Sequence, residues 1–482
     1  MVTRAKDGIV KPRLQPTLLL TRTEPKTTRQ ALSDSTWFAA MQAEHNTLLH
    51  NGTWSLVPLP PNRTPIGCKW VFRVKENLDA TVHKYKARLV AKGFHQQFGY
   101  DYNETFSPVI KPVTARLILT LVLTHRWPLK QLDVNNAFLN GTLAEEVYMT
   151  QPTGFESSDK TLVCRLHKAI YGLKQAPRAW FEKLKSTLLQ FHFQASKCDP
   201  SLFVYSVDNN IIYVLVYVDD IIITGNNSIV LQSLVSRLHS AFSLKDLRDL
   251  DYFLGIEVKN QSDGSLILTQ SKYIRNLLNR TDMEASKPIS SPMVSGCKLS
   301  KIRSEKFPDA SLYRSVVGAL QYATIIRPEI SFSVNKVCQF MSQPLEQHWI
   351  VVKRILRYLK GIISWGLRLQ PSPSTSSLSI QAYCDADWAS DPDDRRSTSG
   401  ASIFLGPNLV SWWSKKQNVV ACSSTEAEYR SLALAAAEVM WIQTLLSELR
   451  VNHSPPVIFC DNMSIVALAH NPVLHARTKH ME

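Results

Sequence analysis

The sequence predicts an α+β protein built from several domains. At 482 residues the chain is too long for one ordinary hydrophobic core and suits two to four domains. Short apolar runs with strand character, around residues 132–138 and 211–224, are mixed with helical stretches such as 179–191. After residue 288 the pattern becomes largely helical, and beyond a Pro- and Ser-rich segment at 371–377 strands and helices alternate again.

The composition is that of a folded and strongly basic protein. Hydrophobic residues make up 44% of the chain and charged residues 20%, so disorder is not expected outside the ends. The formal net charge of +15 favours a polyanionic partner such as nucleic acid, because Lys and Arg replace the counterions of phosphates. A basic surplus that serves solubility alone is the alternative.

The cysteines and the apolar runs exclude several classes of protein. None of the eight cysteines forms a Cys-x-x-Cys pair, so neither a zinc ribbon nor a disulfide framework is indicated, and a reduced compartment fits best. The longest apolar run, residues 211–218, is far too short to cross a bilayer and ends in two aspartates. We therefore expect a soluble protein with no membrane partner.

The first folded element is predicted to be a helix. Residues 1–30 are basic and without periodicity, which is typical of a tether. Ser33 or Asp34 can cap the helix that follows, and Asn51 and Gly52 can close it. Its apolar face is formed by Trp37, Met41 and Leu48.

A β-hairpin is predicted next, from residues 70–74 and 84–90 on either side of a polar turn. The period of two puts Lys84, Lys86 and Arg88 on one face of the second strand. Such a row of cations suits a triphosphate or a template backbone, and a solvated strand edge is an equal alternative.

The helical part of the chain carries an amphipathic stripe. The apolar residues are Trp349, Val352, Ile355, Leu356 and Leu359, and the opposite face presents Lys353, Arg354, Arg357 and Lys360. A basic face of this kind is usually solvated, and nucleic-acid contact is the second interpretation.

Two adjacent acids, Asp219 and Asp220, are predicted at the tip of a hairpin between the β-forming runs 211–216 and 221–224. A polar turn is the plain interpretation. Burying both carboxylates in so apolar a segment without a cation would cost several kcal/mol, so a divalent metal ion is the natural compensation. A third acid, Asp133, ends another strand-like run. Three carboxylates brought together can hold two magnesium ions about 3.5–4 Å apart, which activate a 3′-hydroxyl and stabilise a pyrophosphate leaving group.

The order of these motifs resembles the polymerase motifs of copia-type retrotransposon reverse transcriptases. The resemblance runs from about Ala31 to the last residue, and the order of the blocks is more specific than any one of them. The blocks are residues 86–94 (KARLVAKGF), 132–141 (LDVNNAFLNG), 171–180 (YGLKQAPRAW), 217–220 (YVDD) and 252–257 (YFLGIE).

The resemblance implies a right-hand-like polymerase followed by a ribonuclease H-like α/β domain. Fingers and palm would occupy residues 31–287 and a helical thumb or connection region residues 288–370, with the linker at 371–377 and the ribonuclease H-like domain at 378–482. The implied activity is RNA-directed DNA synthesis in cytoplasmic retrotransposon particles. The implied partners are an RNA template, a DNA primer, an RNA–DNA hybrid and deoxynucleoside triphosphates.

The resemblance also implies a role for each matching position. Asp133, Asp219 and Asp220 would bind Mg²⁺, or Mn²⁺ in its place, and Phe138 would exclude a ribose 2′-hydroxyl. The residues implied at the nucleotide are Lys86, Arg88, Ala137, Phe138, Tyr171 and Lys174, and those implied at the primer grip are Phe253, Leu254, Gly255 and Ile256. One departure is Asn135, where the family often has Lys, and we expect little effect from it.

A second set of acids resembles the metal site of ribonuclease H. Asp385 ends a predicted strand, Glu428 lies in a predicted helix, and Asp461 follows the apolar run 457–460. Each acid alone is more typical of a surface, and Asp387 and Glu426 are close alternatives. Together they would hold two magnesium ions that activate water to cut the RNA strand of a hybrid.

The resemblance further predicts that the ribonuclease H-like domain is incomplete at its C-terminus. The family continues beyond residues 479–482 with a loop and a helix that bears a fourth metal-binding acid, so weak or absent hybrid cleavage is expected. Two other functions remain open: a silent transposon relic that only binds nucleic acid, and a metal-dependent phosphatase for small molecules. The basic N-terminal part of the chain and the extended set of motifs argue against a phosphatase.

Overall fold

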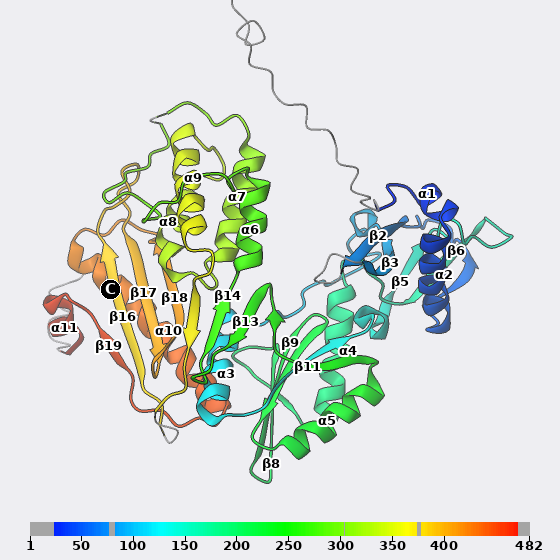
Figure 1. The fold of residues 1–482 in the computed structure, drawn as a ribbon, viewed down its shortest axis with the longest axis horizontal. Coiled ribbons are helices and arrows are strands. Elements are labelled where there is room, and N and C mark those ends of the chain that lie inside the picture. The colour runs from blue at the N-terminus through cyan, green and yellow to red at the C-terminus, as the bar shows by residue number, and fades with distance from the viewer. Residues whose placement is uncertain (1–23, 77–81, 303, 374–376, 471–482) are drawn as a thin grey trace, which may run out of the picture. The chain divides into compact units, whose positions relative to one another are not determined.

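The computed structural model describes residues 24–76, 82–302, 304–373 and 377–470. The chain divides into two compact units, residues 1–106 with 138–183 and residues 107–137 with 184–482. Helices and strands occur in both units, which confirms the predicted mixture of α and β structure (Figure 1). The chain passes from the first unit into the second within helix α4 (Ala176–Gln190).

The first unit combines a long antiparallel hairpin, a three-stranded antiparallel sheet with strand order β1-β6-β5, and two helices. The predicted hairpin and the predicted first helix are both present. The elements are α1 (Thr28–Ser33), α2 (Ser35–His50), β1 (Trp54–Pro58), β2 (Cys68–Glu76), β3 (Val82–Ala91), the short 3₁₀ turn η1 (Gly93–His95), β5 (Thr142–Met149) and β6 (Leu162–Lys168).

Helix α2 begins at Asp34, one of the two predicted caps, whose carboxylate accepts hydrogen bonds from the first turn of the helix. The predicted apolar face is buried and packs on β3, where the rings of Trp37 and Tyr85 lie 4.9 Å apart. The predicted tether is partly wrong, because α1 already begins at Thr28. Residues 1–23 lie outside the described part of the chain.

The second unit contains a six-stranded sheet, here called the central sheet, with strand order β11-β4-β10-β9-β8-β7. Helix α5 (Ser228–Ala241) packs against β10, and α3 (Pro112–His125) begins with Pro112 at its first turn. The strands are β4 (Leu129–Val134), β7 (Gln194–Ala195), β8 (Leu202–Val207), β9 (Asn210–Tyr217), β10 (Asp220–Gly225) and β11 (Leu244–Asp249), and a 3₁₀ turn η2 (Ala137–Asn140) follows β4.

A four-stranded sheet and a group of packed helices follow along the chain. The helices lie side by side around one buried apolar cluster (Figure 1). The strands are β12 (Tyr252–Phe253), β13 (Ile256–Asn260), β14 (Leu266–Thr269) and β15 (Gly366–Leu369), and the helices are α6 (Ser271–Arg280), α7 (Ala310–Ala323), η3 (Pro328–Ile330), α8 (Ser331–Cys338) and α9 (Glu346–Gly361).

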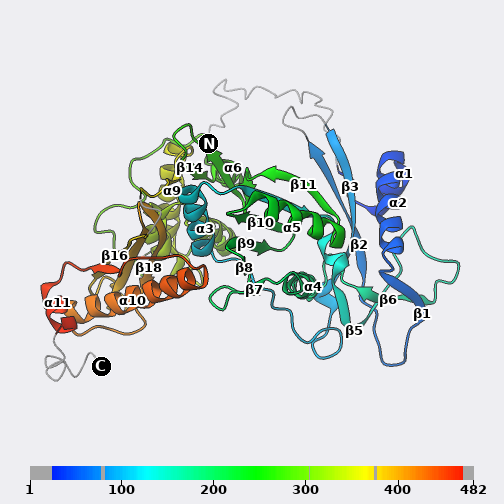
Figure 2. The ribbon, with the colours of Figure 1, turned by 90° about the horizontal axis from the view of Figure 1, so that it is seen from below.

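The last part of the second unit is a four-stranded sheet covered by a long helix. Its strand order is β18-β17-β16-β19, and β19 runs parallel to β16 while the other neighbours are antiparallel. Helix α10 lies along β16 and β17 (Figure 2). The elements are β16 (Ile380–Asp387), β17 (Thr398–Leu405), β18 (Asn408–Lys416), α10 (Ser424–Glu448), β19 (Val457–Phe459) and α11 (Met463–His470).

One buried cluster runs through most of the second unit. It includes Tyr213 and Ile222 of the central sheet together with Ile380 and Ile403 of the last sheet. The compact units therefore do not divide at the predicted linker 371–377, and the predicted domain limits stay interpretations of the sequence. Among the described residues, no helix combines the length and the apolar character that a bilayer span requires.

The amphipathic stripe of α9 is confirmed, because its apolar residues face the helical cluster. Its basic face has a role that neither interpretation predicted. Arg354 Nη2 donates to Ser291 Oγ at 2.8 Å, Arg357 Nε donates to the Lys287 carbonyl at 2.7 Å, and Lys360 Nζ donates to the Ser286 carbonyl. These cations hold the segment between α6 and α7 against the helix.

Candidate active sites

The β9–β10 hairpin places two acids at its tip, as the sequence predicted. Tyr217 and Asp220 are paired across the hairpin, and Val218 and Asp219 form the two-residue turn between them. Val218 has a φ of 53°, a left-handed backbone that is unusual for a β-branched residue. The flanking strands hold this turn in place.

Asp133 lies directly opposite Asp220. The two residues are register partners in the antiparallel pair of β4 and β10, and the Val134 amide donates to the Asp219 carbonyl at 3.1 Å. Opposed residues of this kind have Cβ atoms about 4.5–5.5 Å apart. The structure therefore brings together the three acids that the sequence named for the polymerase site.

The electrostatics of this cluster favour a bound cation. Burial, together with the charges of Asp219 and Asp133, raises the pKa of Asp220 to about 6, and a hydrogen bond from Gln131 Nε2 at 3.2 Å opposes this shift. Repulsion between the carboxylates disappears when a divalent ion neutralises them, and oxygen ligands are those that Mg²⁺ prefers. The three acids supply oxygen ligands of the kind that such an ion requires, although their ligand atoms are not all within 4.8 Å of one another in the described part of the chain.

Gln131 is a residue of this site that the sequence analysis missed. Its Nε2 donates both to Asp220 and, at 3.0 Å, to the Tyr252 carbonyl. It therefore connects the acid cluster to the start of the predicted primer grip. The available signal was its position two residues before Asp133, which places both side chains on the same face of β4.

The predicted primer grip forms a tight hairpin between β12 and β13. Leu254 and Gly255 both have left-handed backbones, with φ of 54° and 70°. The Tyr322 hydroxyl donates to the Leu254 carbonyl, and a Cβ atom at position 255 would collide with that hydroxyl. The rings of Phe253 and Tyr217 meet edge to face with centroids 6.3 Å apart, so this hairpin contacts the hairpin that carries the aspartates.

The first unit gathers four of the six residues predicted at the nucleotide. The Arg88 guanidinium lies 4.0 Å from the centroid of the Tyr171 ring, whose edge-to-face partner is Phe138 at 4.7 Å. Arg88 Nε is buried and has no hydrogen-bond partner among the described residues. Lys86 projects from the same face of β3 as Arg88, opposite the face that packs on α2.

The other two predicted nucleotide residues have different surroundings. Lys174 Nζ donates to the Gln96 carbonyl at 3.3 Å and to the Tyr102 hydroxyl at 3.1 Å, so it links two loops of the first unit. Ala137 is buried and belongs to the second unit, because the division falls between Ala137 and Phe138.

A second acid cluster forms where α10 crosses the last sheet. Asp385 lies on β16, Glu428 on the first turns of α10, and Asp461 just after β19. Burial raises the pKa of Glu428 to about 7, helped by a hydrogen bond to Asp385 and by the charges of Asp385 and Asp461, while the Ala386 amide opposes the shift. The structure therefore brings these three predicted acids together.

The alternatives Asp387 and Glu426 have other surroundings. Glu426 accepts from the Cys422 amide at 2.7 Å and forms an ion pair with Arg430 at 2.8 Å, so it closes the first turn of α10. Asp387 lies at the end of β16, opposite Thr398, and its charge acts on Lys336.

Glu428 supplies the clearest sign that this cluster suits a cation. The residue is only 8% exposed, and its Oε2 atom has no hydrogen-bond partner among the described residues. A buried carboxylate oxygen without a partner is costly. Glu428 and Asp461 offer carboxylate oxygens within 4.8 Å of each other, and Asp385 joins them through its hydrogen bond with Glu428, so oxygen ligands suited to a hard divalent ion meet here.

Comparisons with known proteins show the family to which the chain belongs. Residues 51–295 match the family described as reverse transcriptase (RNA-dependent DNA polymerase). The chain is 50% identical, over its whole length, to the retrovirus-related Pol polyproteins from transposons RE2 and RE1 of Arabidopsis thaliana. It is 40% identical, over 95% of its length, to the retrovirus-related Pol polyprotein from transposon TNT 1-94 of Nicotiana tabacum. The chain spans about a third of the length of these curated relatives, 33% for RE2 and RE1 and 35% for TNT 1-94.

The motifs, the convergence of the acids and these similarities support one another, and the resemblance that the sequence predicted is confirmed. The chain belongs to the reverse transcriptase (RNA-dependent DNA polymerase) family and is a copia-type retrotransposon Pol sequence.

Proposed function

We propose that this chain is an RNA-directed DNA polymerase, which extends a DNA primer on an RNA template inside cytoplasmic retrotransposon particles. The observation that carries the proposal is the register pairing of Asp133 with Asp220, beside Asp219 in the hairpin turn. These carboxylates hold Mg²⁺, or Mn²⁺ in its place. Ions held there would lower the pKa of the primer 3′-hydroxyl and would stabilise the pyrophosphate leaving group.

The residues around this cluster position the reacting groups. Gln131 fixes one oxygen of Asp220, which sets the direction of that carboxylate. The β12–β13 hairpin, through Leu254 and Gly255, holds the primer end, and the contact of Phe253 with Tyr217 keeps it aligned with the acids.

The nucleotide is bound by residues of the first unit. Arg88 supplies donors to the triphosphate, and its unpartnered Nε is one of them. Lys86 adds a second cation. Phe138, held by the Tyr171 ring, fills the space of a 2′-hydroxyl and selects deoxyribonucleotides.

The second cluster supports a second activity of the same protein. Asp385, Glu428 and Asp461 hold the metal ions of a ribonuclease H-type site, which hydrolyses the RNA strand of an RNA–DNA hybrid. The unpartnered Oε2 of Glu428, at the point where three acids meet, is the observation that favours this activity.

Primer extension in Mg²⁺ on an RNA template tests the main proposal. Asp219→Asn removes a charge that no neighbour replaces, so the rate should fall by orders of magnitude while template binding is retained. Asp208→Asn is the matched control, because Asp208 is an exposed acid with a φ of 48° at the β8–β9 turn of the same sheet. Near-normal extension by Asp219→Asn would exclude the proposed site.

Two further measurements with the same variants, of template binding and of phosphate-ester hydrolysis, separate the alternative functions. A silent relic would bind the primed template without extending it, and a small-molecule phosphatase would hydrolyse a simple phosphate ester at a rate sensitive to Asp219→Asn.

A further inference from the structure

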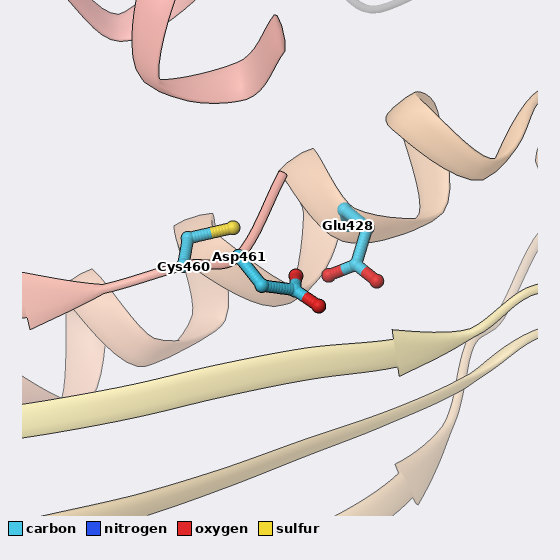
Figure 3. A group of neighbouring side chains, drawn as sticks. All are labelled: Glu428, Cys460 and Asp461. Atoms are coloured by element: carbon cyan, nitrogen blue, oxygen red, sulfur yellow. The ribbon is translucent and has the colours of Figure 1, made fainter. Parts of the chain in front are cut away.

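The cluster around Glu428 contains a sulfur atom. The thiol of Cys460 and one carboxylate oxygen each from Glu428 and Asp461 all lie within 4.8 Å of one another (Figure 3). Glu428 comes from α10, while Cys460 and Asp461 follow β19. In Figure 3 the carboxylates of Glu428 and Asp461 point toward each other, and the Cys460 side chain lies beside Asp461.

This spacing is close to that of a bound transition metal ion. Zn²⁺ lies about 2.3 Å from a thiolate sulfur and about 2.0–2.2 Å from a carboxylate oxygen, so tetrahedral ligands are roughly 3.5 Å apart. Because the ligand atoms lie within 4.8 Å of one another, these separations need to shorten by at most roughly 1.3 Å to reach that spacing. The unpartnered and buried Oε2 of Glu428 is a separate sign that a cation belongs here.

A second sulfur lies beside the first. Tyr383 and Phe459 are register partners on the parallel strands β16 and β19, so the next residues along the chain, Cys384 and Cys460, are neighbours. Cys384 Sγ donates to the Phe459 carbonyl oxygen at 3.6 Å, and burial together with the neighbouring Cys460 raises the pKa of the Cys384 thiol. The described residues, which include all eight cysteines, contain no disulfide, so both thiols are free to bind a metal ion.

We propose that Cys460, Glu428 and Asp461 form a site for a thiophilic divalent cation of the Zn²⁺ class. Thiolates select Zn²⁺ and related ions, whereas Mg²⁺ requires oxygen ligands in near-octahedral geometry. A Zn²⁺ ion at this position takes two carboxylates away from Mg²⁺. Occupancy therefore blocks hybrid cleavage, and this regulatory part of the inference rests on the proposed ribonuclease H-type function.

Metal binding is tested without any reference to activity. Cd²⁺ is titrated into the full, reduced chain, and the ultraviolet charge-transfer band between sulfur and Cd²⁺ is recorded. In the wild type, the Cd²⁺ ion that binds most tightly should produce this band. Cys460→Ser should weaken the binding of that ion at least tenfold. Cys422→Ser removes an exposed thiol of the same sheet-and-helix region and should titrate like the wild type. Equal titrations of Cys460→Ser and the wild type would overturn the site.

Inhibition is tested with a labelled RNA–DNA hybrid in Mg²⁺ and increasing Zn²⁺. Zn²⁺ should inhibit hybrid cleavage by the wild type. Cys460→Ser, measured against its own rate without Zn²⁺, should need a Zn²⁺ concentration at least tenfold higher for the same inhibition. Primer extension by the same variant shows that the chain is folded. Inhibition of both proteins at the same concentration would refute the regulatory role, and so would a variant without any cleavage, because the thiol would then belong to the hydrolytic site. If the wild type cleaves no hybrid in Mg²⁺ alone, the proposed activity and the regulatory role fail together, and the Cd²⁺ titration still decides the metal site.

Discussion

Val218 shows how a single residue fixes the backbone beside an acid that we propose to be catalytic. Its left-handed backbone, with a φ of 53°, occupies a hairpin position where Gly is preferred, and strain of this kind costs about 1–3 kcal/mol. The strands on both sides and the hydrogen bond from Val134 to the Asp219 carbonyl compensate for it. The sheet therefore holds the turn, and the fixed backbone restricts where the Asp219 carboxylate can lie.

Phe138 offers a test of sugar selection. Its ring is held edge to face by Tyr171 at 4.7 Å, so Phe138→Ala should open the space of a 2′-hydroxyl and raise ribonucleotide incorporation at least tenfold. Single-nucleotide incorporation with matched ribo- and deoxyribonucleotides measures the ratio. Phe155→Ala, which removes another half-buried ring of the first unit, controls for general loosening. Unchanged discrimination in Phe138→Ala would place the gate elsewhere.

His348 makes the stability of the helical cluster depend on pH. The ring is fully buried, its Nδ1 accepts from the Leu345 amide at 3.0 Å, and its Nε2 lies 3.1 Å from the Ser300 carbonyl. Burial lowers the pKa of His348 from its usual 6.5, although the Ser300 carbonyl and the charge of Asp393 oppose the shift. Both nitrogens are therefore matched to the neutral ring.

The sign of the pH dependence follows from this lowered pKa. Below pH 6.5 the unfolded chain takes up a proton that the folded chain excludes. The stabilisation is complete above pH 6.5 and is lost as the pH falls toward the pKa of the folded state. When the pH is lowered from about 7.5 to about 5.5, chemical denaturation should show a larger loss in the free energy of unfolding for the wild type than for His348→Asn. The exposed substitution His239→Asn should behave like the wild type. Parallel profiles for all three proteins would contradict this prediction.

At the scale of elements, the β12–β13 hairpin depends on Gly255 for two separate reasons. The first is its φ of 70°, and the second is the Tyr322 hydroxyl, which occupies the place of a Cβ atom. Gly264 separates the two effects, because it has a φ of 80° and no atom within 4 Å of a Cβ position.

Gly255→Ala should therefore destabilise the protein more than Gly264→Ala does. The backbone effect alone costs about 1–2 kcal/mol, and the collision adds to it by moving Tyr322 away from the Leu254 carbonyl. Thermal unfolding and primer extension should both show this order. Tyr322→Phe in the Gly255→Ala background should recover part of the loss. Equal effects of the two alanine substitutions would show that the collision is relieved at no cost.

At the scale of the whole molecule, local patterns were predictable from the sequence and distant contacts were not. The cap at Asp34 and the hairpin that carries Asp219 and Asp220 follow from neighbouring residues, and their periods are visible in one chain. The convergence of Asp385, Glu428 and Asp461 was supplied by the family resemblance, which stands in for the missing tertiary information.

The predictions that failed, and the residues that were missed, involve contacts between distant segments. The basic face of α9 binds the carbonyls of Lys287 and Ser286, and nothing in a helical period indicates such partners. Gln131 and Cys460 owe their importance to neighbours on other strands and helices. The apolar core of the second unit likewise joins residues that precede and follow the segment 371–377. For Gln131 and Cys460, the one signal available in the sequence was a polar residue one or two positions before a predicted metal-binding acid.

Arg116 joins three distant segments of the second unit. From α3, its Nε donates to the Val410 carbonyl of β18 at 2.7 Å and its Nη1 donates to the Ile325 carbonyl at 2.7 Å. Its guanidinium also lies 4.0 Å from the centroid of the Trp412 ring. Burial lowers the pKa of Arg116 to about 9, and the charge of Glu438 opposes the shift, so the group remains a cation at neutral pH.

Arg116→Lys should destabilise the second unit as a whole. Lysine lacks the planar fork, so at least one buried carbonyl loses its donor at a cost of about 1–3 kcal/mol, and the stacking on Trp412 is lost as well. Because the cluster around Arg116 is continuous from the central sheet to α10, the unit should still unfold in one transition, at a temperature several degrees lower. Arg126→Lys, an exposed change at the end of the same helix, should leave that temperature unchanged. Calorimetry that resolved two separate transitions in Arg116→Lys would show that the last sheet and the central sheet are stabilised independently.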